Sequence, residues 1–577
     1  MALTKPVKFI PNIEMPMRDG TILRADMFRP DDGDAHPVIL GRSPYNKQLY
    51  DPYRPWQLFA DRGYIVLVQD CRGRNASEGV FYPFIDEMQD GYDSVEWAAS
   101  QKWSTGSVGM FGTSYLGVTQ WMAAAAAPPH LKTIIPSFTS CDYHNGWIYQ
   151  NGALLRAFSL IWGLGSFIGD ALAKAKLPPE EKKRIAEEVG TLMSDEKALM
   201  ERMPLEDMPV LSKHGLAPYY ADYLAHPDGD DYWERWNLAN YHNKIQVPIF
   251  SMGGWYDMFL GATFQNYHGM VKNGGSKLAR ENQKLVIGAW AHNRPQFSSN
   301  PYPDISFGPK VGGGAIDLDG QSVRWFDRWL KGIENGIDRE PKLTIFTTGR
   351  NAWQNPPSWP LPNTQYTNFY FHSRGRANSR HGDGVLSPTA PSDEPQDTYI
   401  YDPRNPVPTR GGGAFLFGGA WEQEHIEERT DILVYTSAPL PEDLEVTGPV
   451  SVTFWAASTA KDTDFTAKLT DVFPDGLSMN IADNIIRARY REGLTKQKFI
   501  QPGEVYEYTI DLYSISNLFK KGHRIRLDIS SSNFPRFDRN PNTGTVISKE
   551  TELRPAMQTI FHSAKHPSHI RLPVIKR

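Results

Sequence analysis

The alternation of apolar and polar residues changes its period along the chain. Near the N-terminus, "EMPMRDGTILRADMFRP" alternates around an "RDG" turn, which predicts a β-hairpin. Continuously apolar runs such as "YIVLV" at 64–68 follow, as in strands covered on both faces. Between these runs, Met88, Tyr92, Val95 and Ala98 recur at helical spacing. Strands and helices therefore alternate up to about residue 140, which predicts an α/β core with a largely parallel sheet.

Residues 141–244 follow a different pattern. "ALLRAFSLIWGLGSFIGDALAKAK" and "PPEEKKRIAEEVGTLM" have helical spacing and little strand signal, which predicts a helical insertion. The α/β pattern resumes over 245–351, in "VPIFSMGGWYD" and "KLVIGAWAHN". From 352 to 577, short alternating strands lie between glycine and proline turns and predict a β-sandwich or jelly roll. We therefore expect a core built from 1–140 and 245–351, with a helical domain inserted in it and a β-domain after it.

Composition and charge narrow the class of protein. A chain of 577 residues is longer than one hydrophobic core usually supports. The net charge of −5 and the pI near 6.3, with no basic stripe, argue against nucleic acid as a partner. No apolar window reaches about 18 residues and the first residues have no apolar leader, so we expect no membrane span and no secretory signal. Cys71 and Cys141 make no disulfide framework, which favours a cytoplasmic protein.

One serine lies between two glycines where a predicted strand meets a predicted helix. In "GMFGTSYLGVTQ", Ser114 follows a short apolar run and precedes helical text. A sharp turn there would raise the hydroxyl above the sheet edge, where the helix N-terminus stabilises negative charge. The usual motif is G-x-S-x-G, but Gly117 follows the serine by three residues instead of two. The spacing alone gives equal support to Ser114 as a nucleophile and to Ser114 as a residue of a plain glycine-flanked turn.

A nucleophilic serine needs a base, and the base needs an acid that orients it. In α/β hydrolases the acid and then the histidine follow the serine, each just after a strand of the sheet. "VPIFSMGGWYD" ends a predicted strand with Asp257, and "KLVIGAWAH" ends the next with His292. The alternatives are a helix cap for Asp257 and an ordinary loop residue for His292. The order of all three residues at strand ends favours a catalytic triad.

An oxyanion hole completes such a site. One donor would be the backbone N–H of Tyr115, directly after the nucleophile. The loop "GRSPYNK", after an early strand, offers Tyr45, whose phenol can donate a hydrogen bond. The alternative for Tyr45 is a surface tyrosine that packs on Pro44.

With these residues the sequence resembles the cocaine esterase family of serine hydrolases, which is related to Xaa-Pro dipeptidyl peptidases and α-amino acid ester hydrolases. The resemblance covers nearly the whole chain. G-x-S-Y-x-G is the form of the serine motif in this family. The other matching stretches are "RSPYNK", "QDCRGRNASEG", "GWYD", "GAWAHN", "DTDFTAKLTDVFPDG", "ARYREG", "SSSNFPRFDRNPNTG" and "HPSHIRLPVIKR".

The resemblance implies an α/β-hydrolase core, an inserted helical cap and a C-terminal jelly roll, with no metal or cofactor. By position, Ser114 matches the nucleophile, His292 the base and Asp257 the acid. Tyr45 and the Tyr115 amide match the oxyanion hole. The residues that match the aromatic lining of the acyl pocket are Trp147, Trp162, Phe259 and Phe417. The cap departs most from the family pattern, and places Arg156 near the expected pocket.

We therefore expect a carboxylic ester hydrolase that acts through an acyl-enzyme on small esters with aryl or other bulky acyl groups, and a homodimer would fit. One alternative is an amide- or peptide-directed relative, which the absence of an acidic residue directly after Ser114 weakly disfavours. Another is a non-catalytic binding protein whose jelly roll engages a carbohydrate or polymer. The histidines of "HSAKHPSH", His562, His566 and His569, show no acidic or cysteine partner at ligand spacing and are expected at the surface.

Overall fold

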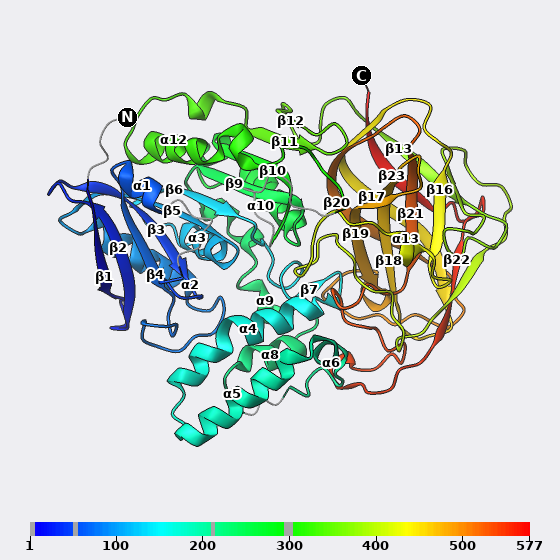
Figure 1. The fold of residues 1–577 in the computed structure, drawn as a ribbon, viewed down its shortest axis with the longest axis horizontal. Helices are drawn as coiled ribbons and strands as arrows, with labels where there is room; N and C mark the ends of the chain where they lie inside the picture. Colours follow the sequence, from blue (N-terminus) through cyan, green and yellow to red (C-terminus); the bar gives the residue numbers. More distant parts are fainter. Residues whose placement is uncertain (1–5, 50–55, 209–213, 293–303, 577) are drawn as a thin grey trace.

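The computed structural model describes residues 6–49, 56–208, 214–292 and 304–576. Two β-rich bodies lie side by side, and helices pack below and between them (Figure 1). None of the described helices has the length and apolar character that a membrane span requires.

The first body is built on a 10-stranded sheet. In the order of the sheet, neighbouring strands from β4 to β11 pair in parallel, whereas the pairs at both ends of the sheet are antiparallel. The predicted α/β core and its N-terminal hairpin are thus confirmed. In sheet order the strands are β1 (Val7–Pro16), β2 (Ile22–Pro30), β4 (Ile65–Asp70), β3 (His36–Ser43), β5 (Ser104–Thr113), β6 (Leu131–Ser137), β9 (Ile249–Tyr256), β10 (Gln283–Ala291), β11 (Leu343–Thr347) and β12 (Ala352–Gln354).

Helices cover this sheet and carry the strand connections. Every residue of β4 and β10 is buried, as their continuous apolar runs predict. A Cβ on Gly91 of α2 would lie 2.7 Å from the Cβ of Ala123, so α2 and α3 pack closely through small residues. The helices of this body are α1 (Trp56–Asp61), α2 (Glu87–Ala99), α3 (Tyr115–Ala125), α10 (Leu260–Asn273), α11 (Lys277–Glu281), α12 (Leu318–Leu330) and the short 3₁₀ turns η3 (Gly313–Ile316) and η4 (Ile337–Arg339).

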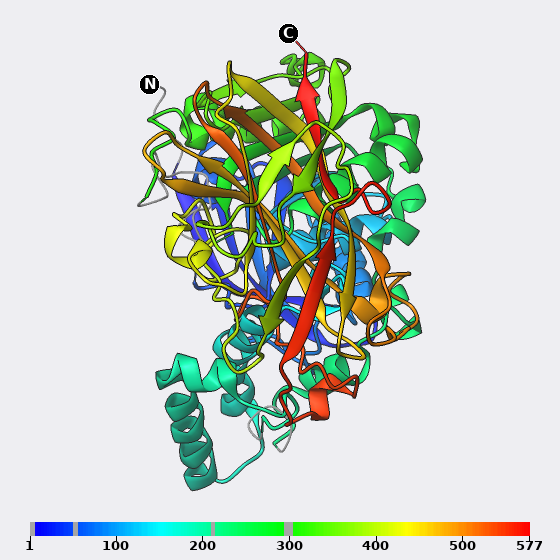
Figure 2. The same ribbon diagram turned by 90° about the vertical axis from the view of Figure 1, so that its right-hand side faces the viewer.

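A helical cap lies between β6 and β9 in the chain. Its longest helix, α4, runs beneath the two β-rich bodies and buries much of its surface, whereas α5 lies farther out (Figures 1 and 2) and is mostly solvent-facing, with Ile185 buried. A short hairpin that the sequence did not predict, β7–β8, precedes the helices. The elements are β7 (Tyr149–Gln150), β8 (Ala153–Leu154), α4 (Arg156–Lys174), α5 (Pro179–Ser194), α6 (Glu196–Glu201), α8 (Pro218–Ala225), α9 (Asp231–Glu234), η1 (Leu238–Asn240) and η2 (His242–Lys244).

The second body is an 11-stranded antiparallel-rich sheet. It begins at Thr364, later than the boundary of 352 expected from the sequence, because β12 pairs with β11 in the first sheet. Its elements are β13 (Thr364–His372), β14 (Val385–Ser387), β15 (Asp397–Tyr401), α13 (Glu424–Glu427), β16 (Leu433–Ser437), β17 (Leu444–Ser458), β18 (Asp464–Val472), β19 (Ser478–Arg487), η5 (Ala488–Tyr490), β20 (Tyr506–Phe519), β21 (Arg524–Ser530), η6 (Ile547–Lys549), β22 (Ala556–Phe561) and β23 (His569–Ile575).

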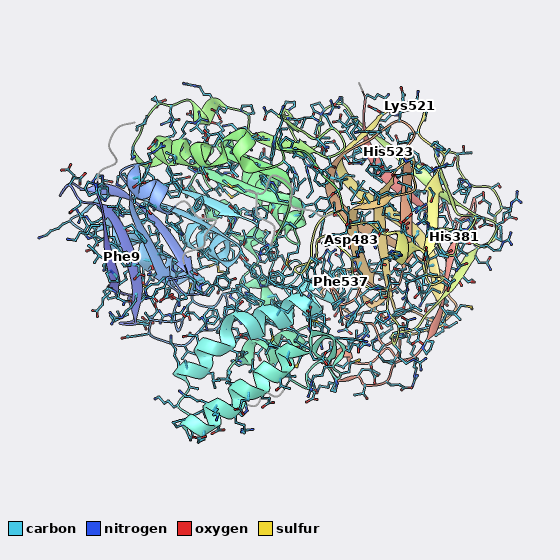
Figure 3. The ribbon with its side chains drawn as sticks, in the orientation of Figure 1. Phe9, His381, Asp483, Lys521, His523 and Phe537 are labelled. Carbon is cyan, nitrogen blue, oxygen red and sulfur yellow. The ribbon has the colours of Figure 1, made fainter. Side chains whose placement is uncertain are left out.

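The cap hairpin joins the first body to this β-domain. The side chain of Gln150 donates to Asn484, and Arg487 donates to the carbonyl of Gly152. Figure 3 labels Phe537 and Asp483 on the side of the β-domain that faces the cap. Phe537 is fully buried in the same apolar cluster as Trp147 of the cap. Cap, core and β-domain are therefore packed through one continuous core.

His562 contradicts the expectation of a surface histidine. It is fully buried, and its Nε2 lies 2.9 Å from Oδ2 of Asp397. The pairing of β15 with β22 brings these two residues together. Their separation of 165 positions is why the local spacing of the histidines gave no sign of an acidic partner.

Candidate active site

Ser114 lies at the sharp turn between β5 and α3. Its backbone has φ 60° and ψ −122°, outside the conformations that a non-glycine residue adopts without strain. The turn is held because Ser114 N–H donates to the Ser137 carbonyl, at 2.9 Å. Its own carbonyl accepts from the amides of Gly117 and Val118, at 2.8 and 3.1 Å. The side chain is thereby presented at the carboxyl edge of the parallel strands.

The unusual glycine spacing has a steric cause. Gly112 has φ 156°, and a Cβ there would lie 2.4 Å from the Cβ of Leu116. A Cβ on Gly117 would lie 2.7 Å from the Cβ of Thr139, in the loop after β6. Both distances are too short for any side chain. The second glycine is therefore fixed by where α3 meets the loop after β6, one residue later than in the usual motif.

His292 and Asp257 approach the serine from the two neighbouring strands β10 and β9. Nε2 of His292 lies 3.0 Å from Oγ of Ser114, and Nδ1 lies 2.8 Å from Oδ2 of Asp257. The second carboxylate oxygen accepts from the Phe259 amide at 2.6 Å. The side chains of His292 and Asp257 are 6% and 1% exposed. The structure thus brings the three predicted residues together as a hydrogen-bonded series in which a buried carboxylate orients the imidazole.

Tyr45 follows β3, and its phenol points at the serine. The phenol interacts with the Ser114 side chain and accepts a hydrogen bond from Trp162 Nε1 at 3.2 Å. Burial raises the pKa of Tyr45 to about 12, so the phenol stays protonated at neutral pH and its O–H can donate. Tyr115 is the first residue of α3, where an amide has no acceptor within the helix. The two predicted oxyanion donors therefore flank Ser114.

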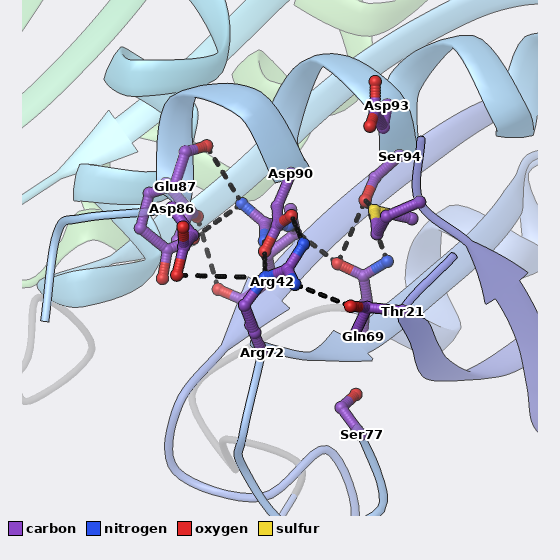
Figure 4. Close-up of polar contacts among 12 residues, drawn as sticks. Thr21, Arg42, Gln69, Arg72, Ser77, Asp86, Glu87, Asp90, Asp93 and Ser94 are labelled. Carbon is purple, nitrogen blue, oxygen red and sulfur yellow. Dashed lines mark hydrogen bonds and ion pairs between the residues drawn. The ribbon is translucent and has the colours of Figure 1, made fainter. Parts of the chain in front are cut away.

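The side chain of Tyr115 contacts a buried charged cluster, whose members Arg42, Glu87 and Gln69 are labelled in Figure 4. Its hydroxyl accepts from the Phe84 amide at 2.9 Å and donates to Glu87 at 3.1 Å. Glu87 pairs with Arg42 at 2.7 Å, and Arg42 also donates to Gln69 at 2.7 Å. Burial raises the pKa of Glu87, and the neighbouring Arg42 opposes the rise. The cluster ties the start of α3 to α2, and nothing in the sequence motifs indicated it.

Aromatic rings surround the triad on the cap side. Trp147 stacks on Phe259 with ring centroids 4.6 Å apart, and Phe259 lies edge-on to His292 at 5.2 Å. Trp162 lies 5.5 Å from Trp147. Phe158 of α4, which the sequence analysis missed, stacks on Trp162 at 5.5 Å. The sequence could have indicated Phe158, because it lies one helical turn before Trp162.

Phe417 is placed differently from the other three predicted lining residues. It is 66% exposed, with φ 54° in the glycine-rich loop after β15. Phe415 takes the inner position, with its ring 5.8 Å from His292 and 5.0 Å from Phe158. Phe417 therefore lies outside the ring cluster at the triad, but it lines the adjoining cavity, so its assignment to the acyl pocket stays a prediction. The left-handed backbone at 417 turns this side chain outward.

Arg156 also departs from its predicted position. Its guanidinium is 1% exposed and donates to the carbonyls of Leu199, Met200 and Arg202, at 2.9 to 3.3 Å. It therefore caps the C-terminal end of α6 and does not enter the region of the triad.

A cavity of about 190 Å³ lies beside the triad, between the cap and the glycine-rich loop. Met258, next to the catalytic-site aspartate in sequence, forms part of its wall. Phe158 and Phe415, whose rings also contact Trp162 and His292 respectively, form the part of its wall nearest the triad. Its lining also includes Leu155, Glu196, Leu416, Phe417, Pro535 and Arg536.

A serine on a strained strand-to-helix turn, with histidine and aspartate at the ends of two adjacent parallel strands, defines the class as an α/β-hydrolase-type serine hydrolase.

The comparisons with known proteins agree. Residues 19–294 match the family model "X-Pro dipeptidyl-peptidase (S15 family)", and residues 335–571 match "X-Pro dipeptidyl-peptidase C-terminal non-catalytic domain". The chain is 38% identical to cocaine esterase of Rhodococcus sp. over 98% of both chains. It is 27% identical to a putative serine esterase of Mycobacterium tuberculosis, over 93% of this chain and 87% of that protein.

Solved structures give the same fold. An aminopeptidase from a Thaumarchaeota archaeon superposes with a TM-score of 0.81 at 24% identity, over 99% of this chain and 97% of the other. An α-amino acid ester hydrolase superposes with a TM-score of 0.79 at 22% identity, over 100% and 97%. The chain belongs to the cocaine esterase family within the S15 hydrolases, and it is a serine ester hydrolase. The alternative of a non-catalytic binding protein is thereby wrong.

Proposed function

We propose that this esterase cleaves small esters with aryl or other bulky acyl groups, and that it does so through an acyl-enzyme on Ser114. The observation that carries the proposal is the series from Ser114 through His292 to Asp257, at 3.0 and 2.8 Å. It lies against aromatic rings of the cap, and Phe259 contacts the histidine itself.

The proposed reaction has two halves. Ser114 Oγ attacks the ester carbonyl carbon while its proton moves to Nε2 of His292, and the carbonyl oxygen accepts from Tyr45 and the Tyr115 amide. The tetrahedral intermediate collapses, and His292 gives the proton to the departing alcohol. A water then attacks the acyl-serine, giving its proton to His292, and the acid leaves as Ser114 regains its proton. Asp257 holds the imidazole tautomer and stabilises its cation.

Two features support a bulky apolar substrate. The rings of Trp147, Trp162 and Phe259 offer faces and edges to an aryl acyl group. The adjoining cavity of about 190 Å³ exceeds the roughly 150 Å³ that accommodates benzene in a protein interior. The cocaine esterase relative carries the name of an aryl ester substrate, which agrees with this proposal.

The test is a rapid-mixing experiment with p-nitrophenyl esters of graded acyl size. We expect a burst of one p-nitrophenol per active site, abolished in Ser114→Ala, with benzoate and bulky acyl esters acylating faster than acetate. Slow turnover without a burst, identical in both proteins, would exclude Ser114 as the nucleophile. A burst with acetate but none with benzoate would exclude the aryl preference alone.

Amide or peptide cleavage is a second candidate, because the family model and the archaeal neighbour carry peptidase names. A substrate with a free α-amino group needs a carboxylate near the reaction centre, and Glu196 on α6 contributes one to the cavity beside the triad. Turnover of aminoacyl p-nitroanilides that falls in Glu196→Gln would favour this candidate. Unchanged turnover of p-nitrophenyl benzoate in that variant is the control.

We also propose a reducing, cytoplasmic setting, because Cys71 and Cys141 are both buried free thiols. Recovery of the protein from the cytosolic fraction, with both thiols titratable after denaturation, would be the expected result. The homodimer stays a prediction, which sedimentation velocity would test.

A further inference from the structure

The loop after β4 carries "QDCRGRNASEG", a motif that the proposed reaction does not use. Within it, Arg74 is 2% exposed and lies between the Tyr45 loop and the cap. Its Nε donates to the carbonyl of Pro44, the residue before Tyr45, at 2.7 Å. Its two terminal nitrogens donate to the carbonyls of Phe167 and Ser166 in α4, at 3.2 and 2.9 Å. The Arg74 guanidinium thus links the backbone next to Tyr45 to one turn of the cap helix α4.

That same turn of α4 makes direct contact with Tyr45. The ring of Phe167 stacks on Tyr45 with centroids 6.1 Å apart and planes inclined by 5°. Five residues before Phe167, Trp162 donates its indole N–H to the Tyr45 phenol at 3.2 Å. The position of the phenol therefore depends on the position of α4, which Arg74 fixes relative to the loop.

The surroundings of Arg74 hold it in one orientation. Its guanidinium lies over the rings of Phe81 and Phe167, at 5.2 and 5.0 Å. Asp170 of α4 pairs with it at 3.2 Å and accepts from the Asn75 amide at 3.0 Å. Burial lowers the pKa of Arg74 and Asp170 opposes the shift, but an arginine stays charged at neutral pH. A lysine has no planar fork and cannot bind the carbonyls on both sides at once.

We propose that Arg74 is a positioning residue for the oxyanion hole, which sets the Tyr45 phenol by tying its loop to α4. This rests on the proposed role of Tyr45 as an oxyanion donor. A catalytic group displaced by about 1 Å in a well-aligned site lowers the rate roughly 100-fold. We therefore expect the loss of Arg74 to slow the chemical step.

Arg74→Lys tests the proposal, with Arg156→Lys as the matched control. Arg156 is equally buried and also binds backbone carbonyls of the cap, but its hydrogen bonds go to Leu199, Met200, Arg202 and the Tyr220 hydroxyl and not to the Tyr45 loop. In Arg74→Lys we expect kcat for p-nitrophenyl esters to fall roughly 10- to 100-fold with KM within twofold. Affinity for a trifluoromethyl ketone, which forms the tetrahedral adduct, should fall in proportion. Arg156→Lys should lower the melting temperature and keep kcat within twofold.

A double-mutant cycle separates positioning from general destabilisation. Tyr45→Phe removes the proposed donor and should lower kcat roughly 100- to 1,000-fold. Adding Arg74→Lys to Tyr45→Phe should then cost less than twofold, because the arginine acts through the missing hydroxyl. Equal losses from Arg74→Lys in both backgrounds would overturn the proposal and leave a structural role. If Arg74→Lys does not fold, Asp170→Asn, which loosens the same guanidinium, should give a smaller loss that is also absent in Tyr45→Phe.

The activity of Tyr45→Phe alone distinguishes the oxyanion role of Tyr45 from the positioning role of Arg74. An unchanged kcat in that variant, with the burst still lost in Ser114→Ala, would overturn both the oxyanion role of Tyr45 and the positioning role of Arg74. A lowered kcat in Tyr45→Phe with full activity in Arg74→Lys would overturn the positioning role only.

Discussion

Two clusters of serine, histidine and aspartate among the residues that the structure describes differ in geometry. In the core, His292 uses one ring nitrogen for Ser114 and the other for Asp257. In the β-domain, Nε2 of His562 faces both Ser373, at 3.2 Å, and Asp397, at 2.9 Å, and Nδ1 lies 3.6 Å from Glu394. Residue types alone therefore do not define a triad.

The serine of the β-domain cluster directs its hydroxyl at the carboxylate instead of the histidine. Ser373 donates directly to Asp397 at 2.8 Å, and Tyr435 donates to the same carboxylate oxygen at 2.8 Å. Ser373 is 7% exposed and its backbone has no positive φ. Ser114, in contrast, is strained, partly accessible and beside the two proposed oxyanion donors. The comparison teaches that a proton relay needs a close acid on the ring nitrogen opposite the serine, a serine hydroxyl directed at the imidazole, and a serine that substrate can reach.

The largest expected difference between the clusters is in the two serines. Ser114→Ala should lower kcat roughly 10⁵-fold, because the acyl-enzyme can no longer form. Ser373→Ala should keep kcat within twofold and lower the melting temperature. Steady-state hydrolysis of p-nitrophenyl esters and thermal unfolding of both variants measure this. A loss of activity in Ser373→Ala at full folding would contradict the distinction.

The two aspartates provide the next largest contrast. Asp257→Asn should lower kcat roughly 10⁴-fold with little change in stability, because the imidazole loses its tautomer and the partner of its cation. Asp397→Asn should keep kcat and lower the free energy of unfolding by about 2 kcal/mol, since it weakens several hydrogen bonds to one buried carboxylate. Urea unfolding measures the second effect. Comparable rate losses in both variants would mean that the β-domain cluster participates in turnover.

The pH dependence of stability tests the structural role of the β-domain cluster. Burial by itself would raise the pKa of Asp397, but hydrogen bonds from His562, the Ala377 amide and Ser373 bring the pKa below its ordinary value. An unfolded aspartate titrates at about 3.9, so Asp397 stabilises the fold above that pH. The contribution is lost as the pH falls through the folded-state pKa. Urea midpoints between pH 3 and 6 should therefore fall less steeply toward acid in Asp397→Asn than in the wild type, and identical slopes would argue against this role.

The smallest expected effect concerns the two phenylalanines of the glycine-rich loop. Phe415→Ala should raise KM for aryl esters about three- to tenfold, the size of one or two lost ring contacts. Phe417→Ala should change KM less than twofold, because its side chain is 66% exposed. The reverse order, measured with p-nitrophenyl benzoate, would show that Phe417 contacts substrate.

The positions of the three triad residues in the first body could be predicted from the sequence because short-range patterns determine them. The apolar runs of β5, β9 and β10 end directly before or at Ser114, Asp257 and His292, and parallel strands place such ends at one edge. The fold class followed from the same periodicity.

The cap and the loops could not be predicted in the same way. The choice between Phe415 and Phe417 depends on one backbone φ in a glycine-rich loop. Arg156 was placed near the pocket by resemblance, but the carbonyls at the end of α6 bind it instead. Long-range pairing of β15 with β22 buries His562, and no local pattern carries that information.

The central claim is that Ser114 carries the acyl group. Wild-type protein mixed with p-nitrophenyl benzoate, quenched in acid within the burst and mapped by peptide mass spectrometry, tests it most directly. The account predicts one benzoyl group per chain, on the peptide containing Ser114, and none on the peptide containing Ser373. A benzoyl group on another residue, or hydrolysis at full rate with no benzoylated peptide, would contradict it.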